Sequence, residues 1–135
     1  YGEERRSRRI AKAIVAGRPL TDSQQLADLV RRSSGYPRGR THPATRTFQA
    51  IRIAVNDEIA ALRSALEQAR DVLAEGGRLV TLSYHSLEDR VIKRFITDGD
   101  LTSLAKRVIR PSKEEVSNNP RSRSAKLRIA ERWSA

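Results

Sequence analysis

The chain has 135 residues and a mass of 15.2 kDa, which is enough for one domain with a single hydrophobic core. It carries 27 Lys and Arg residues against 16 Asp and Glu residues, so its net charge is +11 and a polyanion is the first partner to expect. The absence of cysteine excludes disulfides, thiolate zinc sites and cysteine nucleophiles, and two histidines alone make a poor metal site.

Location and completeness can also be predicted from the sequence. No apolar run is long enough to span a membrane and no signal peptide opens the chain, so we expect a cytoplasmic protein. Because the chain contains no methionine, we expect a processed or partial product. The net charge is +8 over residues 1–52, −3 over residues 53–100 and +6 over residues 101–135. This distribution suits a polyanion that contacts both basic segments; solvated arginine-rich helices are the alternative.

The first 42 residues predict two helices and a basic loop. The first helix spans residues 3–17, with Glu3 and Glu4 in its first turn. Thr21 followed by Gln24 matches a capping box for a second helix over residues 22–32. Residues 33–41 combine two glycines, a proline and two arginines with no periodic apolar positions, which predicts an exposed loop.

The middle of the chain predicts one long helix and then a buried strand. Apolar residues recur every three or four positions from residue 43 to residue 73, which indicates a helix, straight or kinked, that ends at Glu75-Gly76-Gly77. Residues 78–83 form a short apolar run typical of a buried strand. Such a strand needs neighbours, and the first 77 residues supply none. We therefore expect one edge of the sheet to stay open unless a missing segment or another chain pairs with it.

The last third predicts a helix, two strands and a short helical turn. Ser86 to Asp89 has capping-box spacing for a helix with Leu87, Val91 and Phe95 on one face. Residues 106–110 are a weak strand candidate, and a short helical turn begins at residues 112–115. Residues 125–129 alternate apolar and basic side chains, which predicts a strand with one basic face.

The loop that follows the apolar strand has the sequence SYHSLEDR, residues 83–90, and lies where open α/β sheets bind their ligands. Two further segments are notable: HPATRTFQAIRIAVNDE, residues 42–58, and NPRSRSAKLR, residues 119–128. Together the three segments closely resemble the bacterial 16S ribosomal RNA cytosine-N4 methyltransferase family of the MraW type. The opening YGEER is similar as well, so the resemblance covers the whole chain but only the C-terminal half of the family.

The resemblance implies an α/β fold: part of a class I, Rossmann-like methyltransferase sheet with an all-helical N-terminal insert segment. Residues 1–42 would end the RNA-binding insert, and residues 43–135 would form the C-terminal part of the catalytic core. It also implies S-adenosylmethionine as cofactor, with the glycine-rich loop upstream of residue 1 and no cofactor-binding residue in this chain. Gly76-Gly77 does not replace that loop, since it precedes a strand. The connection over residues 97–106 is shorter than is common in the family.

Methylation of an exocyclic cytosine amine requires an unstacked base and acceptors for its two N–H bonds. Ser83 and His85 could accept those bonds and Tyr84 could stack on the base; with Ser86 they are the candidate catalytic residues. The alternative is that Ser83 caps the strand, Tyr84 lies in the core, and His85 and Ser86 fix the next helix.

Four other polar residues have a structural interpretation beside a functional one. The sequence favours His42 as a turn residue rather than an RNA contact, and Asn56 as a polar flank of its helix. Asp89 and Arg90 are more typical of a capping acid and a salt-bridge partner than of pocket residues.

Basic residues at both ends are predicted to contact RNA phosphates. They are Arg38, Arg40, Arg46, Arg121, Arg123, Lys126 and Arg128. The alternative is a solvated charged edge that protects an open strand.

Three hypotheses of function follow. The first is the C-terminal portion of a ribosomal RNA methyltransferase, inactive alone, whose partners are small-subunit ribosomal RNA and the missing N-terminal half, with no membrane and no metal. The second is a non-catalytic basic RNA- or ribosome-binding module. In the third, the other half is a separate polypeptide and activity needs both.

Overall fold

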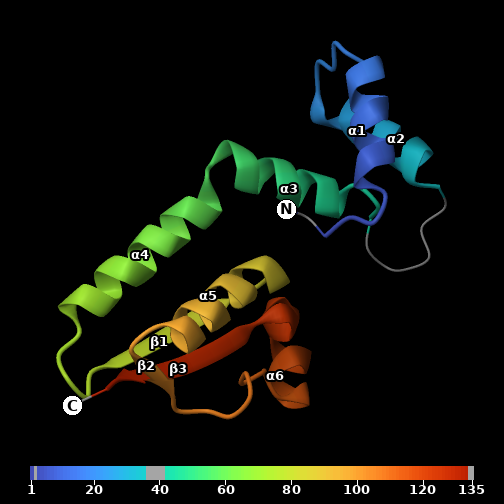
Figure 1. Cartoon of the computed structure of the whole chain (residues 1–135). Coiled ribbons are helices and arrows are strands. Elements are labelled where there is room, and N and C mark those ends of the chain that lie inside the picture. The colour runs from blue at the N-terminus through green and yellow to red at the C-terminus, as the bar shows by residue number, and fades with distance from the viewer. Residues whose placement is uncertain (2, 36–41, 134–135) are drawn as a thin grey trace. The chain divides into compact units, whose positions relative to one another are not determined.

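The computed structural model describes residues 1, 3–35 and 42–133, and the predicted basic loop with Arg38 and Arg40 lies largely outside them. The chain forms two compact units, Tyr1–Glu58 and Ile59–Ala135. Figure 1 shows the elements, which are α1 (Ser7–Ala16), α2 (Ser23–Ser34), α3 (Thr45–Val55), α4 (Glu58–Val72), β1 (Arg78–Ser83), α5 (Ser86–Asp98), β2 (Leu101–Ser103), α6 (Lys113–Asn118), the 3-10 turn η1 (Pro120–Ser124) and β3 (Lys126–Arg132).

The first unit is helical, as the sequence predicts, and has a small core of its own. Ile10 of α1, Val30 of α2 and Ala44 before α3 are buried together. Ile14 and Phe48 pack against them. The border between the units falls at residue 58, whereas the predicted boundary between the insert and the core is at residue 42. That division concerns the roles of the two segments, and it stays a prediction.

The start of α1 differs from the prediction. The helix begins at Ser7, so Glu3 and Glu4 precede it, although a carboxylate oxygen of Glu4 accepts the Arg6 N–H at 2.9 Å. The first turn of α1 holds no acidic residue, and Arg8 and Arg9 are exposed there. Cations at a helix N-terminus oppose the helix dipole. Helix stability therefore does not account for the basic residues of α1.

The cap of α2 lies one residue later than predicted. Asp22 is the N-cap, and its carboxylate accepts the Gln25 N–H at 2.8 Å. The Gln25 side chain reaches back, accepts the Thr21 N–H at 3.2 Å and donates to the Thr21 hydroxyl at 2.8 Å. The capping box predicted for Thr21 and Gln24 is therefore wrong by one position.

The predicted long helix is broken between α3 and α4. Asn56 ends α3, and Asp57 has a φ of +48°, in the left-handed region that Asp tolerates better than most residues. Arg52 donates to both carboxylate oxygens of Glu58, at 2.8 and 2.9 Å, and so bridges the break. Val55 and Ile59 keep the helical spacing of apolar residues across the break. The hydrophobic pattern therefore does not show where the helix is interrupted.

The second unit is built on a three-stranded antiparallel sheet in the order β1-β3-β2. The strands predicted over residues 78–83 and 125–129 correspond to β1 and β3. The strand predicted over residues 106–110 is wrong, because β2 lies at Leu101–Ser103 and Ile109 makes only an isolated bridge to Leu127. Ile109 forms one bridge to Leu127, but its neighbours do not pair with β3. The apolar residues here therefore reflect a single backbone contact with the sheet and not a strand.

One face of the sheet packs against helices. Ile92 and Ile96 of α5, Leu66 of α4, Leu101 of β2 and Ala130 of β3 form the buried core of the unit. Figure 1 shows α5 lying along this sheet. The face predicted for α5 is displaced by one position, because Ile92 and Ile96 are buried whereas Val91 and Phe95 are partly buried beside them.

Glycines and an arginine shape the turn from α4 into β1. The helix ends at Val72, close to the stop predicted at residues 75–77, and Gly76 has a φ of +69° that favours glycine. The Arg132 guanidinium donates to the carbonyls of Arg70 and Leu73, the latter at 2.5 Å. β3 therefore satisfies carbonyl groups that the end of α4 leaves without helical partners.

The opposite face of the sheet, called here the outer face, carries Val80, Leu82, Leu127 and Ile129. Val80 is opposite Ile129 and Leu82 is opposite Leu127, so the four side chains point the same way. Val80 and Leu82 are 58% and 53% exposed. Among the described strands β1 pairs only with β3, so its second edge is open, as the sequence predicts.

Helices able to span a membrane are absent from the described part of the chain, since none combines the required length with the required apolar character.

Truncation of a single core side chain is expected to lower the free energy of unfolding substantially. Ile92→Ala removes a side chain that is 3% exposed, so we expect the free energy of unfolding to fall by about 2–4 kcal/mol. Urea denaturation of the chain measures this change. Val72→Ala is the control, since Val72 is 84% exposed and its truncation should change the value by less than about 0.5 kcal/mol. Equal effects of the two substitutions would contradict the assignment of the core.

Candidate nucleic-acid interface

The candidate site lies at one end of the sheet of the second unit. Ser83, the last residue of β1, pairs with Lys126, the first residue of β3. The loop into α5 leaves the sheet at this end, and η1 enters it here. Two segments that the sequence analysis singled out, residues 83–90 and 119–128, therefore meet at the carboxyl end of β1, where α/β sheets commonly bind ligands.

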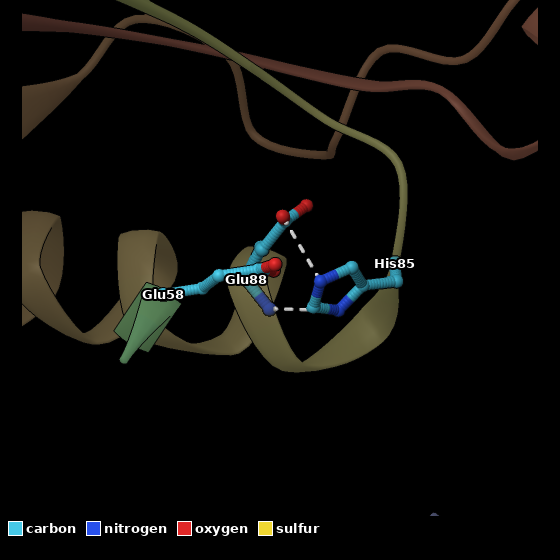
Figure 2. Close-up of side chains that lie close together, drawn as sticks. All are labelled: Glu58, His85 and Glu88. Carbon is cyan, nitrogen blue, oxygen red and sulfur yellow. Dashed lines mark hydrogen bonds and ion pairs between the residues drawn. The ribbon is translucent and has the colours of Figure 1, made fainter. Parts of the chain in front are cut away.

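His85 and Glu88 close the loop before α5 (Figure 2). His85 is the N-cap of α5, and its Nδ1 accepts the Glu88 N–H at 3.4 Å. A carboxylate oxygen of Glu88 accepts the Tyr84 N–H at 3.1 Å, and the other lies 2.9 Å from Nε2 of His85. This reciprocal cap begins one residue before the box predicted for Ser86 and Asp89.

The cap defines what the His85 ring does. Nδ1 of the ring accepts the Glu88 N–H, and Nε2 lies beside the Glu88 carboxylate. The ring fixes the start of α5, as one interpretation of the sequence expects. The proposed role of His85 as an acceptor for a substrate amine is not tested by this geometry and stays a prediction.

The other residues of the loop differ in exposure. Ser83 is 3% exposed, and its hydroxyl has no hydrogen-bond partner among the described residues. Tyr84 is 53% exposed, so its ring is not a core residue. Ser86, half-buried, is the first residue of α5. The Ser83 hydroxyl is therefore a buried polar group without a hydrogen-bond partner among the described residues, and Tyr84 offers an accessible aromatic ring.

Asp89 joins the loop to β3. Its carboxylate accepts a hydrogen bond from Nε of Arg128 at 2.7 Å and lies 3.4 Å from Nζ of Lys126. The three side chains are only 15–17% exposed. We call this group the Asp89 cluster. The sequence favoured Asp89 as a capping acid and Arg90 as the salt-bridge partner; Asp89 is instead the residue that pairs with Lys126 and Arg128, and His85 is the N-cap.

The Asp89 cluster also sets the ionisation of its carboxyl group. Burial would by itself raise the pKa of Asp89, but the hydrogen bond and positive charge of Arg128, together with Lys126, lower that pKa below its ordinary value. Lys126 and Arg128 thus share their charge with Asp89 on the helix-covered face of the sheet. Their predicted contacts with RNA stay predictions.

The turn before β3 presents two arginines. The Asn119 side chain accepts the Arg121 N–H at 3.2 Å, and the Ser122 hydroxyl donates to the Asn119 carbonyl at 2.8 Å. Ser122 is buried, whereas Arg121 and Arg123 on either side of it are exposed. The turn is therefore anchored at its centre by Ser122 and presents two accessible cations, Arg121 and Arg123, at the candidate site.

The remaining predicted residues lie elsewhere. Arg46 is exposed on α3 in the first unit. His42 accepts the Ala44 N–H through Nδ1 at 3.2 Å, which fits its interpretation as a turn residue. Asn56 ends α3 and donates to Glu58 at 3.3 Å. Arg38 and Arg40 lie outside the described residues.

Comparison with known proteins decides the family. The model of the MraW methylase family matches residues 1–133. The chain belongs to this family. It shares 56% identity over 136 residues with ribosomal RNA small subunit methyltransferase H of Coprothermobacter proteolyticus, covering 96% of the chain and 45% of the relative. The proteins of the same name from Deinococcus radiodurans and Synechococcus elongatus are 54% and 56% identical, over 100% and 98% of the chain and 45% and 46% of their own lengths.

This member of the MraW methylase family therefore spans less than half the length of the curated relatives it matches. The resemblance predicted from three sequence segments is confirmed at the level of the family. The fold is confirmed as α/β, with helices and a small antiparallel sheet among the described residues.

The lowered pKa of Asp89 predicts an acid-dependent stability. A folded-state pKa below the unfolded one means that ionised Asp89 stabilises the fold above about pH 4, and that this contribution is lost as the pH falls through the folded-state pKa. Asp89→Asn should therefore lower the free energy of unfolding by about 1–3 kcal/mol at pH 7, with a difference that shrinks below about pH 4. Urea denaturation of both proteins over a pH series measures it.

The control is Asp98→Asn, which removes an exposed carboxylate near the other end of the same helix. It should change the free energy of unfolding by less than about 0.5 kcal/mol at any pH. A constant difference between Asp89→Asn and wild type from pH 7 to pH 2 would show that the ionised carboxylate is not the source of the stabilisation.

Proposed function

We propose that this chain is part of an S-adenosylmethionine-dependent methyltransferase that modifies the exocyclic N4 amine of a cytosine in small-subunit ribosomal RNA. The observation that carries the proposal is the 50–56% identity, over nearly the whole chain, to proteins named ribosomal RNA small subunit methyltransferase H. The resemblance of residues 42–58, 83–90 and 119–128 supports the finer assignment to cytosine N4. Ribosomal RNA as substrate also favours the cytoplasm as the location.

The described residues do not fit the cofactor. A nucleotide-type cofactor site needs a glycine-rich turn that links a strand to a helix. The strand-to-helix connection Tyr84-His85 has no glycine, and the His85 ring already accepts the Glu88 N–H at the start of α5. The connection from β2 to α6, residues 104–112, has no glycine either. Gly76-Gly77 instead links α4 to β1. We therefore place the S-adenosylmethionine site in the part of the enzyme that precedes this chain, and we assign this chain no step that runs through it.

The role proposed for this chain is to hold the substrate. A base that leaves its stack needs an aromatic or apolar surface to replace the lost stacking. Tyr84, exposed and held by its backbone N–H to Glu88, supplies such a surface. The hydroxyl of Ser83, which has no partner among the described residues, is the acceptor that we propose for an N–H of the base. His85 and Ser86 complete the loop that carries them.

Phosphate contacts would place the RNA at this end of the sheet. Arg121 and Arg123 are exposed beside the start of β3, and Arg46 extends the basic surface proposed on the first unit. Charge of this kind positions a nucleic acid without reading its sequence. Residues 1–42 fit the basic end of an RNA-binding insert because their excess charge is not explained by helix stability.

The rest of the enzyme is proposed to cover the sheet. β1 carries apolar side chains on both faces, Leu79 on one and Val80 and Leu82 on the other, a pattern typical of a strand that is buried on both sides. Its second edge is open among the described residues, and Val80 and Leu82 on the outer face are more than half exposed. Because the chain spans 43–46% of its relatives, we propose that the preceding part of the enzyme pairs with this edge and packs on this face.

A second candidate function is a non-catalytic RNA- or ribosome-binding module. The observation that favours it is the combination of a +11 net charge with described residues that do not fit the cofactor. It shares the RNA surfaces with the first proposal and differs only in chemistry.

Calorimetry with S-adenosylmethionine separates these candidates. We expect no micromolar binding to this chain alone and clear binding to the full-length protein, because we place the glycine-rich loop in the preceding part. In the same comparison, amide exchange of β1 should be slower in the full-length protein because its open edge and outer face become covered. Micromolar binding by the chain alone would overturn the proposed location of the cofactor site, and no binding by either protein would favour the non-catalytic module.

The RNA surface predicts a defined salt dependence. Arg121→Gln with Arg123→Gln removes two exposed cations, so the slope of log affinity against log salt for a small-subunit RNA fragment should fall by about 1.4–1.8. Filter binding or fluorescence anisotropy from low to high salt measures the slope. Lys93→Gln with Arg94→Gln is the matched control, since both residues are exposed on α5 and neither belongs to the proposed surface. Equal slopes for the two double variants would contradict the proposed phosphate contacts at η1.

A further inference from the structure

We propose that Asp89 is a positioning residue, which holds the loop carrying Tyr84 in register with the basic turn carrying Arg121 and Arg123. The inference rests on the proposed function, because it concerns how a bound RNA is presented to the methyl donor. It assigns Asp89 no contact with the RNA or the cofactor.

The Asp89 cluster joins two segments that are far apart in the chain. Asp89 lies in the first turn of α5, and Lys126 and Arg128 lie 37 and 39 residues later in β3. Its two carboxylate oxygens take separate partners: Oδ1 accepts from Arg128 at 2.7 Å, and Oδ2 lies 3.4 Å from Lys126. A carboxylate held at both oxygens has little freedom to rotate, so the start of α5 is fixed relative to the start of β3.

Each end of this connection leads directly to a predicted functional segment. The Asp89 N–H donates to the His85 carbonyl at 3.2 Å, and so ties the cluster to the loop. On the other side, the Ala125 N–H donates to the Ser122 carbonyl at 2.8 Å, immediately before Lys126. Tyr84 and the two exposed arginines are therefore connected through this carboxylate as well as through the pairing of Ser83 with Lys126.

The energy balance favours a positioning role for the Asp89 cluster. Moving three charged side chains to 15–17% exposure costs desolvation energy, and apolar side chains of similar size commonly stabilise such a position equally well or better. A hydrogen-bonded charge cluster differs from an apolar contact in that it accepts only one arrangement of its groups. At the junction of the loop and the turn, that property sets the distance between an RNA phosphate bound by the turn and a base stacked on Tyr84.

The expected consequence is a loss of turnover with little loss of RNA binding. Displacing a bound group by about 1 Å can reduce a reaction rate by about 10²-fold, whereas the exposed arginines remain available to the phosphates. In the full-length enzyme, Asp89→Asn should lower kcat by about 10- to 100-fold and change the KM for RNA by less than about threefold. Arg128→Lys keeps the positive charge but loses the fixed Nε donor, so it should fold readily and lower kcat by a smaller factor.

The kinetic experiment uses a matched control and a double variant. Asp98→Asn removes an exposed carboxylate from the same helix and should retain the wild-type kcat. The double variant Asp89→Asn with Arg128→Lys should be no slower than Asp89→Asn alone, because both changes break the same connection. Folded Asp89→Asn and Arg128→Lys enzymes with wild-type kcat would overturn the proposal. So would a rise in the KM for RNA with kcat unchanged.

Hydrogen exchange tests the connection even if the proposed activity fails. If the wild-type full-length protein transfers no methyl group to small-subunit RNA, the proposed function is wrong, but the structural part of the inference can still be measured. In Arg128→Lys, amides of residues 84–89 and 119–126 should exchange faster together, while those of residues 92–96 in the core helix stay unchanged. Uniformly faster exchange over residues 59–133 would show a general loss of stability and overturn the positioning role.

Discussion

The pairing of β1 with β3 is the constraint on which the second unit depends. Six consecutive residue pairs join the strands, and their register turns Leu79 and Ala130 toward α5 while Val80 and Ile129 face the other way. A shift of one residue would exchange the two faces and place Lys126 and Arg128 away from Asp89. The same register brings the loop after Ser83 to the end of the sheet at which η1 enters. Core, charge cluster and candidate interface are therefore consequences of one strand pairing.

Much of the fold follows from local pattern. Glycine at residues 76 and 77, the apolar run that became β1 and the alternation that became β3 were sufficient to predict where those elements lie. Caps were harder, because Thr21, Asp22, His85 and Ser86 are all able to accept a hydrogen bond, and only the backbone geometry selects Asp22 and His85. A kink in the long helix was allowed by the sequence, but its position at Asp57 was not predicted, because a hydrophobic period reports which face is buried and continues across the break. The position of β2 was missed because such a period does not report where a strand finds its partner.

Some features of the candidate site could likewise be predicted from the sequence, and others could not. Its location after a buried strand, and its exposed tyrosine and arginines, could be inferred from residues that are neighbours in sequence. The roles of Lys126 and Arg128 could not, because basic residues alternating along a strand suggest a charged solvent face, and the acid that meets them is 37 residues away or more. His85 was a candidate catalytic residue by sequence. In the structure its Nδ1 accepts the N–H of Glu88 and so caps the adjoining helix.

The strand order of the second unit has a consequence for synthesis. β1 and β2 have no described strand partner except β3, which is the last of the three to be made. As the chain leaves the ribosome, α4, β1 and α5 therefore emerge before the strand that completes their sheet, and the Arg132 side chain reaches the carbonyls of α4 later still. Until then Val80 and Leu82 are carried on an unpaired apolar strand. The interval between emergence of residue 83 from the ribosome and emergence of residue 132 is thus the period in which this unit is open to aggregation or to capture by a chaperone.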